Sequence, residues 1–417
     1  MLFTKKMKKL ATLTILMQIV LFMHAQSWTQ LNTGSSYNFT DCCFVNADTG
    51  YVTGFFPWGE YRVPFVYKTT DGGTTFSYQQ LDYGVTWWQA ICFTSENKGF
   101  LVGDAIRVTS DGGNFWNTVL DMWMISGTLR DITFSTPQKG YTVGEDWYQL
   151  PLFYKTTDGG MTWNNYPIVS EATAITSISS PAEGILYTGA NSYGTGIHTF
   201  SKSTDDGATW TQTSFTENIF TLCFISTDDG FAGTDGGIFK TTNGGDNWTS
   251  VLATSSAVNS IDIKNGFGFA VCYDGSIYQT TNNGDNWIQI ISPVQGTKVL
   301  NAVSVVSPQR AYTAGSAGTV LKYTAPFVGI ESRVANSESI LMYPNPVKDL
   351  CTIKLEGIAP EGISVHIYNL LGQDVLKVAN ISDNSVSLDL TDLEGGLYFY
   401  SIENKNDVIM TSKFVKE

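Results

Sequence analysis

The chain has 417 residues, of which 38 are acidic and 24 are basic, so its net charge at neutral pH is −14. A surface of this sign repels phosphate backbones, which argues against a nucleic-acid partner. Aromatic residues make up 13% of the chain and 40 residues are glycine, a composition that fits packed β-sheets with many turns and excludes a disordered polypeptide.

The first 25 residues have the pattern of a secretory signal peptide. Four lysines within the first nine residues precede a mostly apolar run at positions 10–23, and Ala25 stands directly before Gln26. The run has 14 residues and is interrupted by polar side chains, so it is too short to cross a bilayer comfortably. We therefore expect a cleaved signal peptide at residues 1–25 and no transmembrane anchor after cleavage, with an uncleaved anchor as the alternative.

Six copies of one short turn follow along the chain. Each copy has a hydroxyl residue, Asp or Asn two positions later, Gly two positions after that and an aromatic residue in the eighth position. Asp and Asn side chains accept hydrogen bonds from backbone amides a few residues on, and Gly adopts a positive φ without steric cost, so each copy can close a hairpin by itself. The copies are TTDGGTTF (69–76), TSDGGNFW (109–116), TTDGGMTW (156–163), STDDGATW (203–210), TTNGGDNW (241–248) and TTNNGDNW (280–287).

The spacing of these turns predicts the fold. Their central residues are 40, 47, 47, 38 and 39 residues apart, a period typical of a four-stranded propeller blade. A second repeat, an apolar strand followed by a Gly-bounded strand, occurs seven times, and the last copy ends near Thr324 without a turn of this kind. The segment SWTQL at 27–31 resembles the strands that follow the turns elsewhere. We predict an all-β fold with a seven-bladed β-propeller at residues 27–326, in which the N-terminal strand completes the last blade and closes the ring.

The six turns resemble the Asp-box, or BNR repeat, with the pattern Ser/Thr-x-Asp-x-Gly-x-Thr-Trp. Asp-boxes occur in sialidases, xyloglucan-cleaving hydrolases, sortilin-type receptors and the photosystem II stability/assembly factor family, and the period of about 40 residues is most similar to the last of these. The resemblance implies that the motif builds each blade and lies away from any active site. The expected structural Asp-box residues are Asp71, Asp111, Asp158, Asp205, Asn243 and Asn282.

A second domain is predicted at residues 341–417, after a polar linker at 327–340. Short alternating strands joined by Gly, Asn and Asp turns indicate a small Ig-like β-sandwich. The segments YPNP (343–346), LGQ (371–373), LEGGLY (393–398) and a Lys-containing end resemble the type A C-terminal sorting domain of the Bacteroidetes type IX secretion system. That resemblance implies export across the outer membrane by this machinery, followed by release or attachment to the cell surface. An ordinary accessory Ig-like domain is the alternative.

The six cysteines of an exported chain suggest disulfides. Cys43, Cys92 and Cys223, however, occupy the same position in three different repeats, where blades should hold them apart. We therefore expect buried thiols that act as small apolar side chains, with a disulfide involving Cys42 or Cys272 as the alternative. No Cys and His spacing predicts a zinc site, and no metal or cofactor is expected.

The sequence offers few catalytic groups. A sialidase needs three arginines that converge on the substrate carboxylate. This chain has only five arginines in total, one of them in the predicted linker, and it lacks the Arg-Ile-Pro signature of sialidases. Xyloglucanase-like enzymes place their acidic pair between two propellers, and only one is predicted here. Asp41 and Asp131 are candidates for lining the central channel, as solvated carboxylates or as an acidic pair. No residue is predicted to be catalytic.

Aromatic residues mark one edge of the predicted propeller. This edge is built by the loops that enter each first strand and by the turns that join the second and third strands, and the Asp-boxes lie opposite. Its loops are long and aromatic in blades one to three and shorter in later blades. Flat rings bind sugar faces or anchor protein contacts, although several of these rings could instead pack between blades. The ligand-binding candidates are Trp58, Tyr61, Trp88, Trp123, Trp147 and Tyr148.

These features favour a secreted or cell-surface binding propeller that is exported by the type IX secretion machinery and whose ligand is a glycan or a protein. The alternatives are an Asp-box-type glycoside hydrolase and a scaffold or assembly factor without a small ligand.

Overall fold

The structure is a computed structural model that describes residues 27–417 except 59–60, 82–87, 169–172, 193–194, 326–338, 357–361, 370–372, 382 and 405–406. The predicted signal peptide and most of the predicted linker lie outside the described residues. The chain divides into two compact units, of which the larger is Trp28–Lys322 and the smaller contains Tyr323–Glu417.

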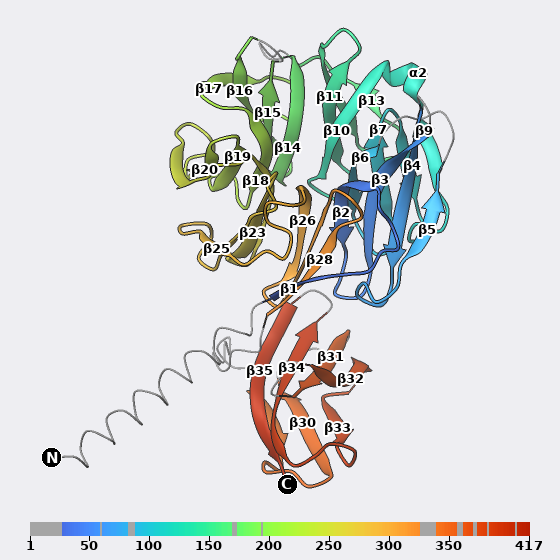
Figure 1. Cartoon of the computed structure of the whole chain (residues 1–417), viewed down its shortest axis with the longest axis vertical. Coiled ribbons are helices and arrows are strands. Elements are labelled where there is room, and N and C mark those ends of the chain that lie inside the picture. Colours follow the sequence, from blue (N-terminus) through green and yellow to red (C-terminus); the bar gives the residue numbers. More distant parts are fainter. Residues whose placement is uncertain are drawn as a thin grey trace, which may run out of the picture. The chain divides into compact units, whose positions relative to one another are not determined.

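The larger unit is a ring of four-stranded antiparallel sheets, coloured from blue to orange in Figure 1. Blades one to three are β2 (Asn38–Phe44), β3 (Gly50–Trp58), β4 (Tyr61–Thr69), β5 (Ser77–Gln80); β6 (Trp88–Phe93), β7 (Gly99–Gly103), β8 (Ile106–Thr109), β9 (Asn117–Leu120); and β10 (Gly127–Phe134), β11 (Gly140–Asp146), β12 (Pro151–Thr156), β13 (Asn164–Asn165). A four-residue helix, α2 (Met122–Ile125), precedes β10.

Four further sheets complete the ring. Blades four to six are β14 (Ala174–Ala182), β15 (Ile185–Asn191), β16 (His198–Ser203), β17 (Thr211–Phe215); β18 (Ile219–Phe224), β19 (Gly230–Thr234), β20 (Gly237–Thr241), β21 (Thr249–Ala253); and β22 (Val258–Lys264), β23 (Phe267–Cys272), β24 (Ile277–Thr280), β25 (Ile288–Ile290). Blade seven contains β26 (Leu300–Ser307), β27 (Arg310–Gly315), β28 (Val320–Thr324) and, as its fourth strand, β1 (Ser27–Gln30).

The two ends of the propeller sequence share one sheet. β1 pairs with β28, and the Leu31 N–H donates to the Val320 carbonyl at 2.8 Å. Trp28 is buried, and its ring meets the edge of Phe269 with 4.9 Å between centroids. Each first strand contacts the first strand of the next sheet, and β26 contacts β2, so the ring is closed. The prediction of a seven-bladed propeller completed by the N-terminal strand is confirmed.

Each Asp-box closes its turn with its own side chains. In the first box the Thr69 hydroxyl donates to the Asp71 carboxylate at 2.8 Å and accepts the Gly73 N–H at 2.8 Å, while the carboxylate accepts the Thr75 N–H at 2.9 Å. The hydrogen bonds from Thr75 lower the pKa of Asp71 to about 2. The same pattern recurs in the other five boxes, at Asp111, Asp158, Asp205, Asn243 and Asn282. The side chains of these six Asp and Asn residues are therefore engaged in hydrogen bonds within their own turns.

Carboxylates on the innermost strands connect neighbouring blades. Asp41 accepts the Ile91 N–H at 2.8 Å, and Asp131 accepts the Ile178 N–H at 2.8 Å. Asp262 does the same for the Val305 N–H at 2.7 Å. Hydroxyl groups replace the carboxylate at other junctions, where Ser177 accepts the Leu222 N–H and Ser304 the Phe44 N–H, both at 3.0 Å. Asp41 and Asp131, the predicted channel carboxylates, thus join adjacent blades.

The stability of the propeller should depend on the titration of Asp41. Desolvation between the inner strands raises the pKa of this carboxyl from 3.8 to about 7, although the N–H donors of Ile91 and Cys42 oppose the shift. The folded state therefore binds this proton more tightly than the unfolded chain does. The stabilisation is complete below about pH 4, and it is lost as the pH rises through about 7. We expect Asp41→Asn, which keeps an acceptor oxygen, to flatten this decline in thermal unfolding measured from pH 4 to 8. An unchanged slope would contradict the assignment.

All six cysteines are free thiols. Cys42, Cys272 and Cys351 are buried, whereas Cys43, Cys92 and Cys223 are half-buried beside the cores of their blades. The Cys43 sulfur lies against the backbone of Phe93 in the next blade, and burial raises its pKa to about 12. The prediction of free thiols packed beside apolar side chains is confirmed, but Cys43, Cys92 and Cys223 are half-buried rather than buried.

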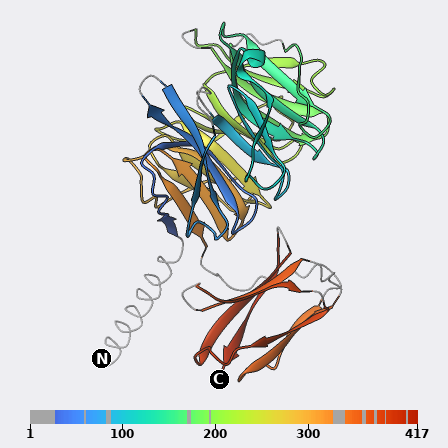
Figure 2. The same ribbon diagram turned by 90° about the vertical axis from the view of Figure 1, so that its right-hand side faces the viewer.

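The smaller unit is a β-sandwich (Figure 2). One sheet has the order β29 (Ser339–Tyr343), β30 (Leu350–Glu356), β33 (Ser385–Asp389), and the other has the order β32 (Asp374–Ile381), β31 (Ile363–Tyr368), β34 (Gly396–Asn404), β35 (Asp407–Lys416). Both sheets contribute to one apolar core. The YPNP segment anchors the last strand, because the Asn345 side chain accepts the Val415 N–H at 3.0 Å and the Val347 N–H donates to the Val415 carbonyl at 2.8 Å.

Candidate functional site

The two edges of the propeller differ in what they expose. In blade three, Gly127 pairs with Asp146, and Phe134 pairs with Gly140, which in turn pairs with Thr156. The turn at 146–150 and the start of β10 therefore lie at one edge, and the Asp-box that begins at Thr156 lies at the other. We call these the loop edge and the Asp-box edge.

Blade three carries a group of exposed apolar side chains at the loop edge. Met124 of α2 is 67% exposed, and in the turn between β11 and β12 Trp147, Tyr148 and Leu150 are 60%, 86% and 59% exposed. The two segments are joined, because the Trp147 N–H donates to the Ser126 carbonyl at 3.0 Å. We call these four side chains the blade-three patch. Large apolar groups gathered on a folded surface indicate a site of interaction.

Local hydrogen bonds fix the conformation of the patch. One oxygen of Asp146 accepts the Tyr148 N–H at 2.8 Å and the Leu150 N–H at 2.7 Å, while Gln149 adopts a left-handed φ of 63°. Asp121 caps α2 by accepting the Met124 N–H at 3.0 Å. Ile125 is buried in the core of the blade. A partner would therefore meet a surface that is already ordered, which reduces the entropic cost of binding.

The predicted ligand-binding residues have different positions in the structure. Trp147 and Tyr148 belong to the blade-three patch. Trp123 lies in α2, and Trp58 pairs with Tyr61 across the turn between β3 and β4, but the side chains of these three residues lie outside the described part.

The prediction that Trp88 binds a ligand is wrong, because its side chain is fully buried. Trp88 begins β6 and packs with Tyr51, Leu101 and Trp116 between the first two blades. The first strands of blades one and three have the buried residues Phe39 and Leu129 at the same position. An alignment of the repeats would have identified Trp88 as a core residue. Leu150, by contrast, was not predicted, and a single leucine in a turn gives no signal in the sequence.

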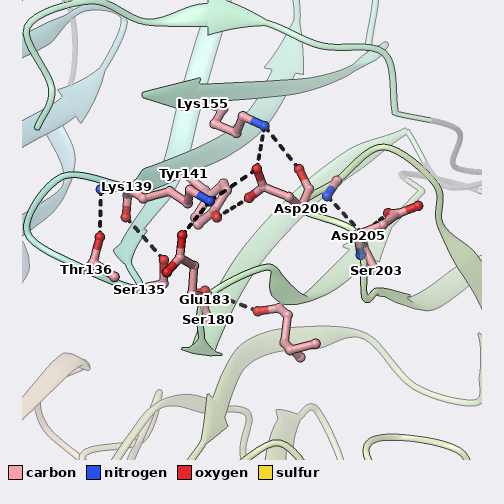
Figure 3. Close-up of polar contacts among 12 residues, drawn as sticks. Ser135, Thr136, Lys139, Tyr141, Lys155, Ser180, Glu183, Ser203, Asp205 and Asp206 are labelled. Atoms are coloured by element: carbon pink, nitrogen blue, oxygen red, sulfur yellow. Dashed lines mark hydrogen bonds and ion pairs between the residues drawn. The ribbon is translucent and has the colours of Figure 1, made fainter. Parts of the chain in front are cut away.

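A cluster of charged side chains at the Asp-box edge is a second candidate (Figure 3). Asp206, in the box of blade four, faces Tyr141 and Lys155 of blade three and accepts hydrogen bonds from both, the latter at 2.7 Å. Lys139 lies 3.5 Å from Asp206 and 2.8 Å from Glu183. The hydrogen bond from Lys155 and that from Tyr141 lower the pKa of Asp206 despite its burial.

This cluster is explained by the contacts between blades. Where blade seven meets blade one, the Lys322 ammonium donates to the Gly72 carbonyl at 2.9 Å. Where blade five meets blade six, Lys240 pairs with Asp285 at 2.5 Å. In each case a lysine of the third strand holds the Asp-box of the following blade. The ammonium groups of Lys139 and Lys155 neutralise the Asp206 carboxylate. This is expected of a structural contact rather than a reactive site.

Neither a metal site nor a membrane-spanning helix is found where the structure describes the chain. No three or more His, Cys, Asp or Glu side chains of the described residues converge as metal ligands do. The helices among the same residues are too short or too polar to cross a bilayer.

Comparisons with known proteins agree with both units. Residues 120–290 match the family model of the photosynthesis system II assembly factor YCF48, and residues 341–417 match that of the secretion system C-terminal sorting domain. No curated protein matches the chain significantly.

Solved structures show the same propeller. YCF48 bound to a D1 peptide is 18% identical with a TM-score of 0.57, and the match covers 74% of this chain and 98% of that one. YCF48 from Cyanidioschyzon merolae is 18% identical with a TM-score of 0.55, covering 72% of this chain and 99% of that one. The WD40 propeller domain of Doa1 is 11% identical, also with a TM-score of 0.55, covering 72% and 97%. At these identities the likeness shows the fold alone.

Proposed function

Because the chain joins an Asp-box propeller of the YCF48 type to a C-terminal sorting domain of the type IX secretion system, we propose that it is a secreted or cell-surface binding protein. The propeller recognises a glycan or a protein through the loop edge of blade three. The observation that carries this proposal is the blade-three patch, in which four large apolar side chains stand exposed on hydrogen-bonded segments. The structure of YCF48 bound to a D1 peptide supports the proposal that the ligand can be a protein, since a propeller of the same fold binds a peptide.

The chemistry of the patch suits recognition. Trp and Tyr present large flat surfaces with few rotatable bonds, so they gain contact area at a small entropic cost. Met and Leu extend this surface with flexible or rounded apolar groups. Trp147 and Tyr148 can therefore stack on a sugar ring or on an apolar side chain of a partner.

The arrangement of the carboxylates favours binding over glycoside hydrolysis. Asp41 and Asp131 accept backbone N–H groups from neighbouring blades. Glu145 is held by a bidentate contact with Arg130. A glycosidase needs one carboxyl to protonate the leaving group and a second on the opposite side of the scissile bond. Carboxylates that already hold backbone or guanidinium groups are poorly suited to both roles.

Replacing Trp147 and Tyr148 together with alanine should weaken ligand binding at least about thirtyfold, because a single aromatic anchor at the centre of an interface contributes about 2 kcal/mol or more. The measurement is binding of the secreted chain to glycan arrays and to envelope protein extracts. Thermal unfolding should stay nearly unchanged, since both side chains are exposed.

Phe115→Ala is the matched control, because Phe115 is 62% exposed but lies in an Asp-box. It should leave binding intact. Equal binding by the wild type and the Trp147/Tyr148 variant would overturn the proposal. A scaffold without a small ligand would instead yield one stable protein partner and no glycan.

A further inference from the structure

The loop edge of the propeller is strongly acidic. Among residues whose side chains the structure describes, its loops and strand ends hold three cationic side chains, Arg107, Arg130 and Lys298. Arg107 is buried beside the Trp88 ring. Its carboxylates number seven: Asp104, Asp121, Glu145, Asp146, Glu217, Asp235 and Asp274. Lys298 belongs to the loop before β26 in blade seven, and Arg130 is already bound to Glu145. The edge therefore presents an excess of negative charge to a partner.

Carboxylates directly flank the exposed aromatic residues of this edge. Asp146 precedes Trp147, and Asp121 caps the helix that carries Met124. In blade six, Tyr273 is 63% exposed and is followed by Asp274. Asp121 and Asp146 form no ion pair with a described lysine or arginine, whereas several lysines at the Asp-box edge pair with acidic groups. Negative charge and apolar surface thus coincide at the loop edge.

This combination selects the chemistry of the ligand. Lysine and arginine bind carboxylates and are also attracted to the faces of Trp and Tyr rings. The stems of their side chains are apolar and can cover Met124 or Leu150. A neutral sugar can donate hydroxyl hydrogen bonds to the carboxylates but gains no charge–charge attraction from them, and an acidic glycan or protein would be repelled.

We propose that the blade-three patch binds a positively charged segment of a partner protein, with apolar residues on the patch and lysine or arginine beside Asp121 and Asp146. This inference rests on the proposed binding function and narrows its ligand to one class. Long-range attraction should speed association, so the charge contributes mainly to the association rate and is weakened by salt.

The test uses the secreted chain and two arrays of 15-residue peptides. Both arrays contain the same apolar and aromatic residues in random order, but one has four lysines or arginines per peptide and the other has four glutamates. A neutral hexasaccharide is the third probe. Asp121→Asn with Asp146→Asn removes two charges while each amide oxygen can still accept the same backbone N–H groups. Asp228→Asn with Asp246→Asn removes two exposed charges from the Asp-box edge as the matched control.

We expect the basic peptides to bind at least tenfold better than the acidic ones. The Asp121/Asp146 variant should lower the association rate for basic peptides about threefold to tenfold. Raising the salt concentration to 0.5 M should lower the rate of the wild type by a similar factor. The Asp228/Asp246 control variant should associate as fast as the wild type. The inference is overturned if the basic and acidic peptides bind equally well or if neither array binds. It is also overturned if the Asp121/Asp146 variant binds basic peptides with an unchanged association rate. If only the hexasaccharide binds and Trp147→Ala abolishes this, the inference fails while the proposed function stands. If no loop-edge variant alters any binding, the proposed function fails too.

Discussion

Replacing Trp88 with alanine is expected to lower the free energy of unfolding of the propeller by about 3–5 kcal/mol, the usual cost of removing a large aromatic side chain from a core. The indole is fully buried and packs against Tyr51 and Trp116, and the Arg107 guanidinium lies 5.8 Å from its ring centre. The cavity would lie between blades one and two, so it would weaken both sheets. Chemical denaturation of the secreted chain, followed by tryptophan fluorescence, measures the effect.

Trp147→Ala is the matched control, since it removes the same side chain from an exposed position. Its effect on the free energy of unfolding should lie within about 0.5 kcal/mol. Trp88→Phe should lose less than Trp88→Ala, because a ring still fills most of the space. Similar stabilities of the two alanine variants would contradict the different burial of the two tryptophans.

These two tryptophans show what a repeat sequence can and cannot predict. The Asp-box period gives the length of one blade, and the second repeat, which occurs seven times, gives the number of blades. The burial of Trp88 can also be predicted from the sequence, because Trp88 aligns with Phe39 and Leu129 in the other repeats, and both of these residues are buried. The aromatic content of a loop does not by itself distinguish an exposed ring from a buried one. Position within the repeat is thus a better guide to burial than residue type.

The other features of the site depend on three-dimensional geometry, which cannot be predicted from the spacing of residues in the sequence. The exposure of Trp147 and Tyr148 follows from a turn that Asp146 holds through two backbone N–H groups. The contact of Asp41 with Ile91 joins strands about 50 residues apart, and its existence depends on the register between two sheets. Neither feature can be read from the local pattern. The acidic character of the loop edge likewise appears only when the loops of separate blades are placed together.

Gly160→Ala should be nearly as damaging as the loss of Trp88, because two separate costs combine. Gly160, in the box of blade three, has a φ of +83°, and a methyl group there would lie 2.2 Å from a ring carbon of Phe100. The left-handed backbone costs a non-glycine residue about 1–2 kcal/mol, and overpacking adds about 1–3 kcal/mol. Phe100 cannot move aside easily, since it is fully buried and stacks on Phe134 with 4.6 Å between ring centres.

Gly34→Ala separates the two costs. Gly34 has a similar left-handed φ of +68°, but a methyl group there would meet nothing within 4 Å. It should therefore show only the backbone cost of about 1–2 kcal/mol, while Gly160→Ala loses about 2–5 kcal/mol in the same denaturation experiment. Equal losses would mean that the Asp-box glycine is required for its backbone conformation alone. A larger loss at Gly160 would show that the absence of a side chain there also makes room for the Phe100 ring of the neighbouring blade, which ties this Asp-box to the packing between blades.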